Sequence, residues 1–252
     1  MAITDITKEE LKSALERSPK VKEELKNIKL LFVPTHIDPE NPEELTSVYK
    51  NVCASNYDTV VIVESYKGEL DKKLSIPSNH SFITPYGEVN VNDKFRNELC
   101  DEEDDFYIHD GGMSDEMSLY TQLMILQVCQ DEFDVVSIQI GDYDPAIVKE
   151  LAFALDELFR SRNALLVFCC DIPNSDTAEL QKLKGLIDSN NESGLHHYLN
   201  SNDKKVEGAR AFMTGILVSK YWDLNIWFTP VTEKTTYTGG FAHAPISEIA
   251  FK

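Results

Sequence analysis

Four apolar runs, each ending in polar or turn-forming residues, constrain the fold of this chain more than any other feature. They are KLLFVPTHID (29–38), YDTVVIVES (57–65), FDVVSIQIGD (133–142) and ALLVFCCD (164–171). Short apolar runs of this kind are typical of strands buried on both faces of a sheet. A helical pattern over 42–55 separates the first two runs, so we expect them to form a parallel pair joined by a crossover helix. The sequence therefore predicts an α/β protein.

Other segments complete this prediction. Residues 7–27 have the apolar spacing of an amphipathic helix. Residues 81–93 alternate around Pro85-Tyr86-Gly87, which predicts a hairpin or an extended loop. Further helices are expected over 114–130, with Ser114 or Asp115 as N-cap, over 145–161 and over 206–222. Helical pieces are expected over 177–199, and closing strands over 225–240 and 244–251. With no repeat or linker, we expect a single domain over 1–252, with 1–27 as an N-terminal helical extension.

The charge and the cysteine content restrict the partners and the location. The formal net charge of −19 argues against binding to nucleic acid or anionic membranes, because phosphates repel a polyanion. No apolar run approaches the roughly 20 residues that membrane insertion requires, and the charged N-terminus lacks the apolar core of a signal peptide. The five cysteines are an odd number, and three of them lie in apolar stretches. We therefore expect reduced thiols and a cytoplasmic protein.

Candidate reactive residues gather at the ends of the first and fourth runs. Cys169 and Cys170 should face opposite sides of a sheet and act as small apolar residues. Asp171 either points into a crevice at the sheet edge or caps the next segment. His36 either forms an acid/base pair with Asp171 or, the interpretation we favour, is a loop histidine bonded to the backbone. The spacing of cysteine and histidine matches no zinc site, and no glycine loop has the context of a phosphate site.

Seven segments, taken in order, resemble the Memo family, which shares its fold with class III extradiol ring-cleaving dioxygenases. They are FVPTHID, VVIVESYKG, TPYGEVNVND, SDEMSLYTQLMILQ, VVSIQIGD, LLVFCCDIPNSD and VEGARAFMTGIL. No single motif is decisive, but their order covers nearly the whole chain. The resemblance implies one α/β domain with a mixed sheet flanked by helices.

The resemblance also implies where a site would lie and what has been replaced there. The family builds its site from two histidines at strand ends and a cysteine before a helix, and these positions hold Thr35, Tyr66 and Glu207. Further family histidines fall on Met117 and Asn174. Transition metals need imidazole or thiolate ligands, so we expect no metal and no cofactor. The expected cleft residues are Thr35, His36, Tyr66, Glu116, Asp171, Asn174 and Glu207. A hard divalent cation held by carboxylates is the second possibility.

Two functions follow from a retained scaffold with replaced ligands. The first is a non-catalytic Memo-like protein that binds a protein or peptide partner, and the resemblance implies roles in signalling and motility. The second is an enzyme that uses the remodelled cleft, oxidoreductase-like or hydrolytic. It would be metal-dependent through Asp171, Glu207 and Glu116, or would use His36 and Tyr66 for acid/base work. His36 and Asp171 are the catalytic candidates for that alternative.

Overall fold

A computed structural model describes most of the chain. The described residues are 6–19, 27–35, 41–68, 70–102, 104–113, 117–142, 144–173, 206–229 and 236–244, with 182, 185, 186, 189, 191, 193, 194 and 197. Several predicted features therefore lie outside the described residues: His36, Glu116, Asn174, most of the helical pieces over 177–199, and the last closing strand.

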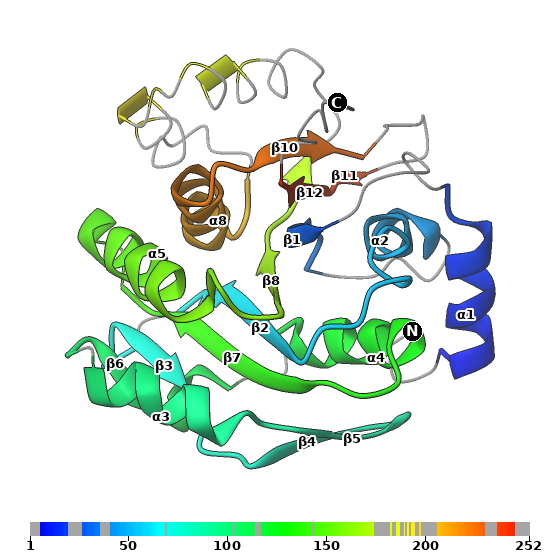
Figure 1. Cartoon of the computed structure of the whole chain (residues 1–252), viewed down its shortest axis with the longest axis horizontal. Helices are drawn as coiled ribbons and strands as arrows, with labels where there is room; N and C mark the ends of the chain where they lie inside the picture. Colours follow the sequence, from blue (N-terminus) through cyan, green and yellow to red (C-terminus); the bar gives the residue numbers. More distant parts are fainter. Residues whose placement is uncertain are drawn as a thin grey trace, which may run out of the picture.

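An eight-stranded mixed sheet forms the centre of the molecule (Figure 1). Its strands are β1 (Ile28–Val33), β2 (Thr59–Ser65), β3 (Leu74–Ile76), β6 (Phe106–Ile108), β7 (Asp134–Ile140), β8 (Ala164–Cys169), β10 (Asn225–Phe228) and β12 (Gly240–His243). They lie in the order β10-β12-β1-β8-β2-β7-β3-β6. The four central strands β1, β8, β2 and β7 are parallel, whereas β12 and β3 run antiparallel to their central neighbours. The α/β class and the mixed sheet are confirmed.

The predicted pairing of the first two strands is wrong in one respect. β1 and β2 are parallel, but β8 lies between them and pairs with both. Leu166 of β8 is opposite Leu30 on one side and opposite Val61 on the other. All six residues of β8 are buried, as are nearly all residues of its neighbours. Because each of these strands is apolar on both faces, the local pattern does not specify which of them are adjacent.

Helices cover both faces of the sheet (Figure 1). On one face lie α2 (Glu43–Tyr49) and α4 (Leu119–Cys129), with α1 (Lys8–Arg17) packed on both, and on the other lie α5 (Pro145–Phe159) and α8 (Ala209–Tyr221). Two hydrophobic clusters result, one on each side. Cys169 belongs to the cluster under α4, and Cys170 to the cluster under α8. The two cysteines therefore face opposite sides, as predicted.

The N-terminal helix is shorter than predicted. It begins after Thr7, whose hydroxyl and the Glu10 carboxylate form a capping box, and it ends at Arg17. Ser18 is extended, with φ −61° and ψ 137°. Because Ser18 precedes a proline, the helical conformation is disfavoured there. Leu11 and Leu15 pack into the same cluster as α2 and α4, which joins α1 to the core.

Short elements account for most of the other differences. Of the two alternatives for residues 81–93, the structure has the hairpin, as β4 (Ser81–Thr84) and β5 (Gly87–Asn90). The sequence did not predict α3 (Asp93–Glu102), the 3₁₀ turn at Asp110–Gly112, or the three-residue strands β3 and β6. Two-residue strands, β9 (Ile172–Pro173) and β11 (Tyr237–Thr238), pair near the end of β8. Strands this short carry too few residues to show an alternating pattern.

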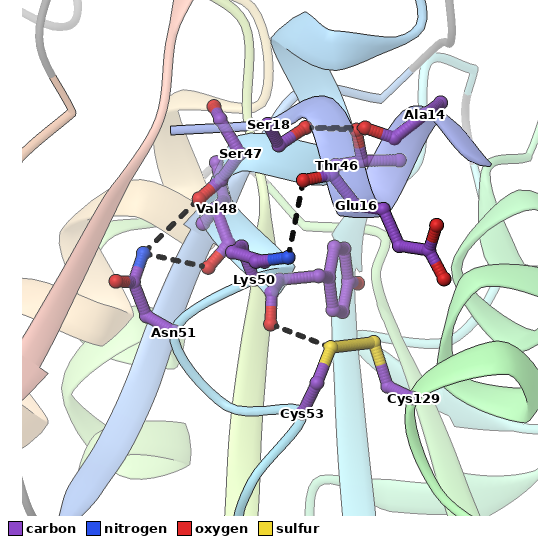
Figure 2. Close-up of a disulfide and its surroundings, with 11 residues drawn as sticks. Ala14, Glu16, Ser18, Thr46, Ser47, Val48, Lys50, Asn51, Cys53 and Cys129 are labelled. Atoms are coloured by element: carbon purple, nitrogen blue, oxygen red, sulfur yellow. Dashed lines mark hydrogen bonds between the residues drawn. A yellow bond between two sulfur atoms is a disulfide. The ribbon is translucent and has the colours of Figure 1, made fainter. Parts of the chain in front are cut away.

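A disulfide joins Cys53, after α2, to Cys129 at the end of α4 (Figure 2). The expectation that all five cysteines are reduced thiols is therefore wrong for this pair; Cys100, Cys169 and Cys170 are free. The two partners are 76 residues apart in sequence. They meet because α2 and α4 pack side by side on one sheet face, which the cysteine spacing alone could not reveal. Lys50 donates to the Glu16 carbonyl in the same corner (Figure 2).

Candidate functional site

A cavity of about 400 Å³ opens at the carboxyl ends of the central parallel strands. Ligands of α/β proteins commonly bind in this position, because the loops after parallel strands meet there. Its lining comes from six regions of the chain. They contribute Thr35 after β1, Glu64 to Gly68 at the end of β2, Met117 before α4, Gln139 of β7 with Cys169 of β8, and Glu207 with Gly208 before α8.

The structure brings together three of the residues that the sequence selected. Thr35, Tyr66 and Glu207 all line the cavity, and so does Met117, at a position where the family resemblance implies a histidine. These residues come from four separate segments of the chain. Asp171 is not part of the lining, and His36, Glu116 and Asn174 lie outside the described residues.

Asp171 holds the end of β1 against the end of β8. The Thr35 backbone N–H donates to Asp171 Oδ1 at 2.7 Å, and the Thr35 hydroxyl donates to Oδ2 at 2.5 Å. The backbone of Asp171 also pairs with that of Glu207, through N···O distances of 2.9 and 3.2 Å. Asp171 is 3% exposed. Asp171 therefore positions two lining residues, Thr35 through its carboxylate and Glu207 through its backbone.

Gly208 allows α8 to begin directly against β8. Its φ is +73°, a conformation that residues with a Cβ rarely adopt. A Cβ at this position would lie 2.5 Å from the Cys169 carbonyl oxygen. The neighbouring Glu207 carboxylate stays at the cavity rim, where it pairs with Lys67 at 3.2 Å. Both side chains are more than half exposed, so this ion pair contributes little to stability.

Glu64 is a buried carboxylate in the cavity lining. The Ser118 backbone N–H and hydroxyl donate to Glu64 Oε1 at 2.8 and 2.6 Å. Burial raises the pKa of Glu64, and the hydrogen bonds from Ser118 and from the Leu119 backbone oppose this rise only in part. The same contact fixes the chain just before α4. That helix begins at Leu119 with Ser118 in the N-cap position, later than the predicted start at Ser114 or Asp115, which lie outside the described residues.

Glu64, Gln139 and Cys169 also line the cavity, although no sequence motif placed them there. A signal existed for the first two. Glu64 and Gln139 are polar residues within otherwise apolar strand runs, and a buried polar group in a strand indicates a specific interaction. Burial raises the pKa of the Cys169 thiol well above its ordinary value. The thiol is therefore neutral at pH 7 and is not activated as a nucleophile.

The lining does not suit a transition metal of the histidine and cysteine type. Its donors are hydroxyl, carboxylate and amide groups, a thioether from Met117 and one neutral thiol. Within the described ranges, no three His, Cys, Asp or Glu side chains are grouped so as to hold a metal ion.

Among the described residues, no helix combines the length and the apolar character that crossing a bilayer requires.

Comparisons with known proteins give a family model and two curated relatives that concern the same family. Residues 5–223 match the model of the family described as Memo-like protein. A MEMO1 family protein of Thermotoga neapolitana is 31% identical over 118 residues, and one of Nitrosopumilus maritimus is 24% identical over 124 residues. These alignments cover 45% and 49% of this chain, and 41% and 45% of the relatives. The chain thus spans less than half the length of the curated relatives it matches.

Solved structures also match the fold. The crystal structure of the uncharacterized protein JW3007 from Escherichia coli K12 does so with a TM-score of 0.60 and 11% identity. The match covers 85% of this chain and 99% of that one. At this identity the likeness concerns the fold alone.

Proposed function

This chain belongs to the Memo-like family, and we propose that it acts as a non-catalytic member that binds a protein or peptide through its strand-end cavity. The observation that carries the proposal is the cavity lining. Thr35, Tyr66, Met117 and Glu207 meet in one cavity, at positions where the family resemblance implies metal-binding side chains. The proposal takes the scaffold as kept and the metal-binding groups as replaced by hydroxyl, carboxylate and thioether groups.

The properties of the cavity support this proposal. A volume of about 400 Å³ lies within the range of ligand sites and accommodates a side chain or a short peptide segment. Glu207 and Lys67 provide exposed charges at the rim. The net charge of −19 favours a basic partner over an acidic one. The proposal includes a cytoplasmic setting and roles in signalling or motility, which the family resemblance implies.

A variant that fills the cavity tests the proposal. Met117 is half-buried in the cavity wall, and Met117→Trp should occupy part of the cavity without disturbing the core. Ile83→Trp is the matched control, because Ile83 is 78% exposed on β4 and does not line the cavity. Peptides are selected from a random library on the purified chain, and their affinities are measured by fluorescence anisotropy.

We expect the selected peptides to bind the unchanged chain and Ile83→Trp equally, and Met117→Trp at least tenfold more weakly. If no peptide is selected, or if Met117→Trp binds as well as the control, the proposal is wrong.

One observation favours the alternative, an enzyme that uses the remodelled cleft. Glu64 is an ionisable group with a raised pKa in a cavity, a combination that is common in active sites. A hard divalent cation bound by the cavity carboxylates would belong to this alternative. Metal analysis of the chain purified without chelator separates the two. Stoichiometric metal that is lost on changing the cavity carboxylates Glu64 and Glu207 to Gln would support the enzyme and contradict the binding protein.

A further inference from the structure

A row of polar side chains crosses four neighbouring strands beneath the cavity. Gln139 of β7 is opposite Glu64 of β2 and opposite Ser75 of β3. Cys169 of β8 continues the row, because it follows Phe168, the partner of Val63. Residues opposite each other in a sheet point to the same face. We call these four residues, Cys169, Glu64, Gln139 and Ser75, the polar row.

The polar row contains three buried oxygen atoms that have no hydrogen-bond partner among the described residues. They are Glu64 Oε2, Gln139 Oε1 and Ser75 Oγ. Glu64 is 5% exposed, and Gln139 and Ser75 are fully buried. The Gln139 amide nitrogen donates to the Ser137 hydroxyl at 2.7 Å, so the side-chain carbonyl oxygen is the atom without a hydrogen bond. Leaving such an atom unpaired costs about 1–3 kcal/mol, so a partner is expected.

Two of these oxygens belong to residues that line the cavity, Glu64 and Gln139. They form its floor, because both side chains are buried whereas Glu207 and Lys67 at the rim are more than half exposed. Two acceptors, one from a carboxylate and one from an amide, are therefore buried directly beneath this floor. A ligand that satisfies both must bring hydrogen-bond donors.

We propose that the cavity floor binds a primary ammonium group, with Glu64 Oε2 and Gln139 Oε1 accepting its hydrogen bonds. This inference rests on the binding function proposed above. An ammonium carries three donors and no acceptor. Glu64 and Gln139 are opposite each other on neighbouring strands, so both side chains lie on the same face of the sheet. The positive charge of the ammonium also pairs with the carboxylate of Glu64.

The other occupants fit less well. A guanidinium matches two oxygens of one carboxylate, but Glu64 Oε1 is already bonded to Ser118. A metal ion would need further ligands, and the described residues hold no group of three ionisable or sulfur ligands for it. An anion would meet two acceptors. The ammonium has two sources, a free small amine or a lysine side chain of a peptide.

Calorimetric titration with matched probes tests the inference. The probes are n-pentylammonium against pentan-1-ol, and acetyl-Gly-Lys-Gly-amide against the same peptide with norleucine. We expect at least one charged probe to bind at least tenfold more tightly than its neutral counterpart. Binding of n-pentylammonium alone would indicate a free amine, and binding of the lysine peptide alone would indicate a partner's side chain.

Variants locate the ammonium. Glu64→Gln keeps the shape of the side chain and removes its charge, and it should reduce the preference for the charged probe to less than threefold. Glu88→Gln is the control, because Glu88 is exposed on β5 and does not line the cavity. Gln139→Met is a second variant that should weaken binding of the charged probe even if Glu64→Gln fails to fold. Equal binding of charged and neutral probes, or a preference that survives Glu64→Gln and Gln139→Met, would overturn the inference.

The results separate this inference from the proposed function. If selected peptides bind and Met117→Trp prevents it, but Glu64→Gln leaves their affinity unchanged, the ammonium site is wrong and the binding function stands. If amines bind and no peptide is selected, the ammonium site stands and the peptide-binding function is wrong.

Discussion

Asp171 and Glu64 are buried carboxylates at the same edge of the sheet, and they are satisfied to different extents. Both oxygens of Asp171 accept from Thr35, one from its backbone and one from its hydroxyl. In Glu64, Ser118 donates two hydrogen bonds to Oε1, whereas Oε2 has no hydrogen-bond partner among the described residues. Glu64 also lines the cavity. A fully bonded carboxylate stabilises its own fold, whereas a half-bonded one retains capacity for a ligand.

The largest effect is expected where the carboxylate is fully bonded. Asp171→Ala would leave the Thr35 N–H and hydroxyl without their acceptor, and we expect the free energy of unfolding to fall by about 3 kcal/mol. Urea denaturation measures this loss. Asp171→Asn, which keeps one carbonyl acceptor, should lose less. A loss below about 1 kcal/mol for Asp171→Ala would show that Thr35 does not depend on this contact.

A smaller effect is expected where Glu64 meets the start of α4. Ser118→Ala removes the hydroxyl that donates to Glu64 Oε1 at 2.6 Å and keeps the backbone donor. We expect the free energy of unfolding to fall by about 1–2 kcal/mol. Ser47→Ala is a control, because the Ser47 hydroxyl donates to a carbonyl within its own helix. Equal losses in both variants would mean that the hydrogen bond to Glu64 stabilises the fold no more than an ordinary hydrogen bond within a helix does.

The smallest effect is a dependence on pH. The pKa of Glu64 is raised in the folded chain, so the folded state holds a proton between the ordinary glutamate value and the raised one, where the unfolded state has lost it. Stability therefore falls as pH rises through this window. Glu64→Gln should remove that fall, so it should gain stability relative to the unchanged chain from pH 4 to pH 7.

Thermal denaturation at a series of pH values measures this gain, with Glu88→Gln controlling for the loss of one surface charge. Parallel stability curves for Glu64→Gln and the unchanged chain would show that Glu64 titrates alike in both states. Glu64 would then not differ from an ordinary surface carboxylate.

The parts of the fold predicted from the sequence are those with long apolar patterns. The four central strands, the hairpin around Pro85 and the helices over 145–159 and 209–221 follow from apolar spacing and turn residues. The order in which the strands lie side by side could not be predicted from the sequence, because β1, β2 and β8 are all apolar on both faces. The disulfide between Cys53 and Cys129 depends on how α2 and α4 pack, which no local pattern specifies.

The candidate site divides in the same way. The order of motifs selected Thr35, Tyr66 and Glu207, and the structure places them in one cavity. The roles of Glu64 and Gln139 could not be read from motifs, because they depend on side-chain partners. A sequence shows that a polar residue interrupts an apolar strand, but only the packed structure shows which of its atoms already has a hydrogen bond.

The position of β8 between β1 and β2 also affects how the chain is synthesised and folds. β1 and β2 leave the ribosome early, yet neither can complete its pairing until residues 164–169 have been made. Until then both strands present open edges to solvent, and such edges promote aggregation. We expect a fragment that ends before residue 164 to aggregate, and the whole chain to fold slowly for its size, because its central pairings join distant segments.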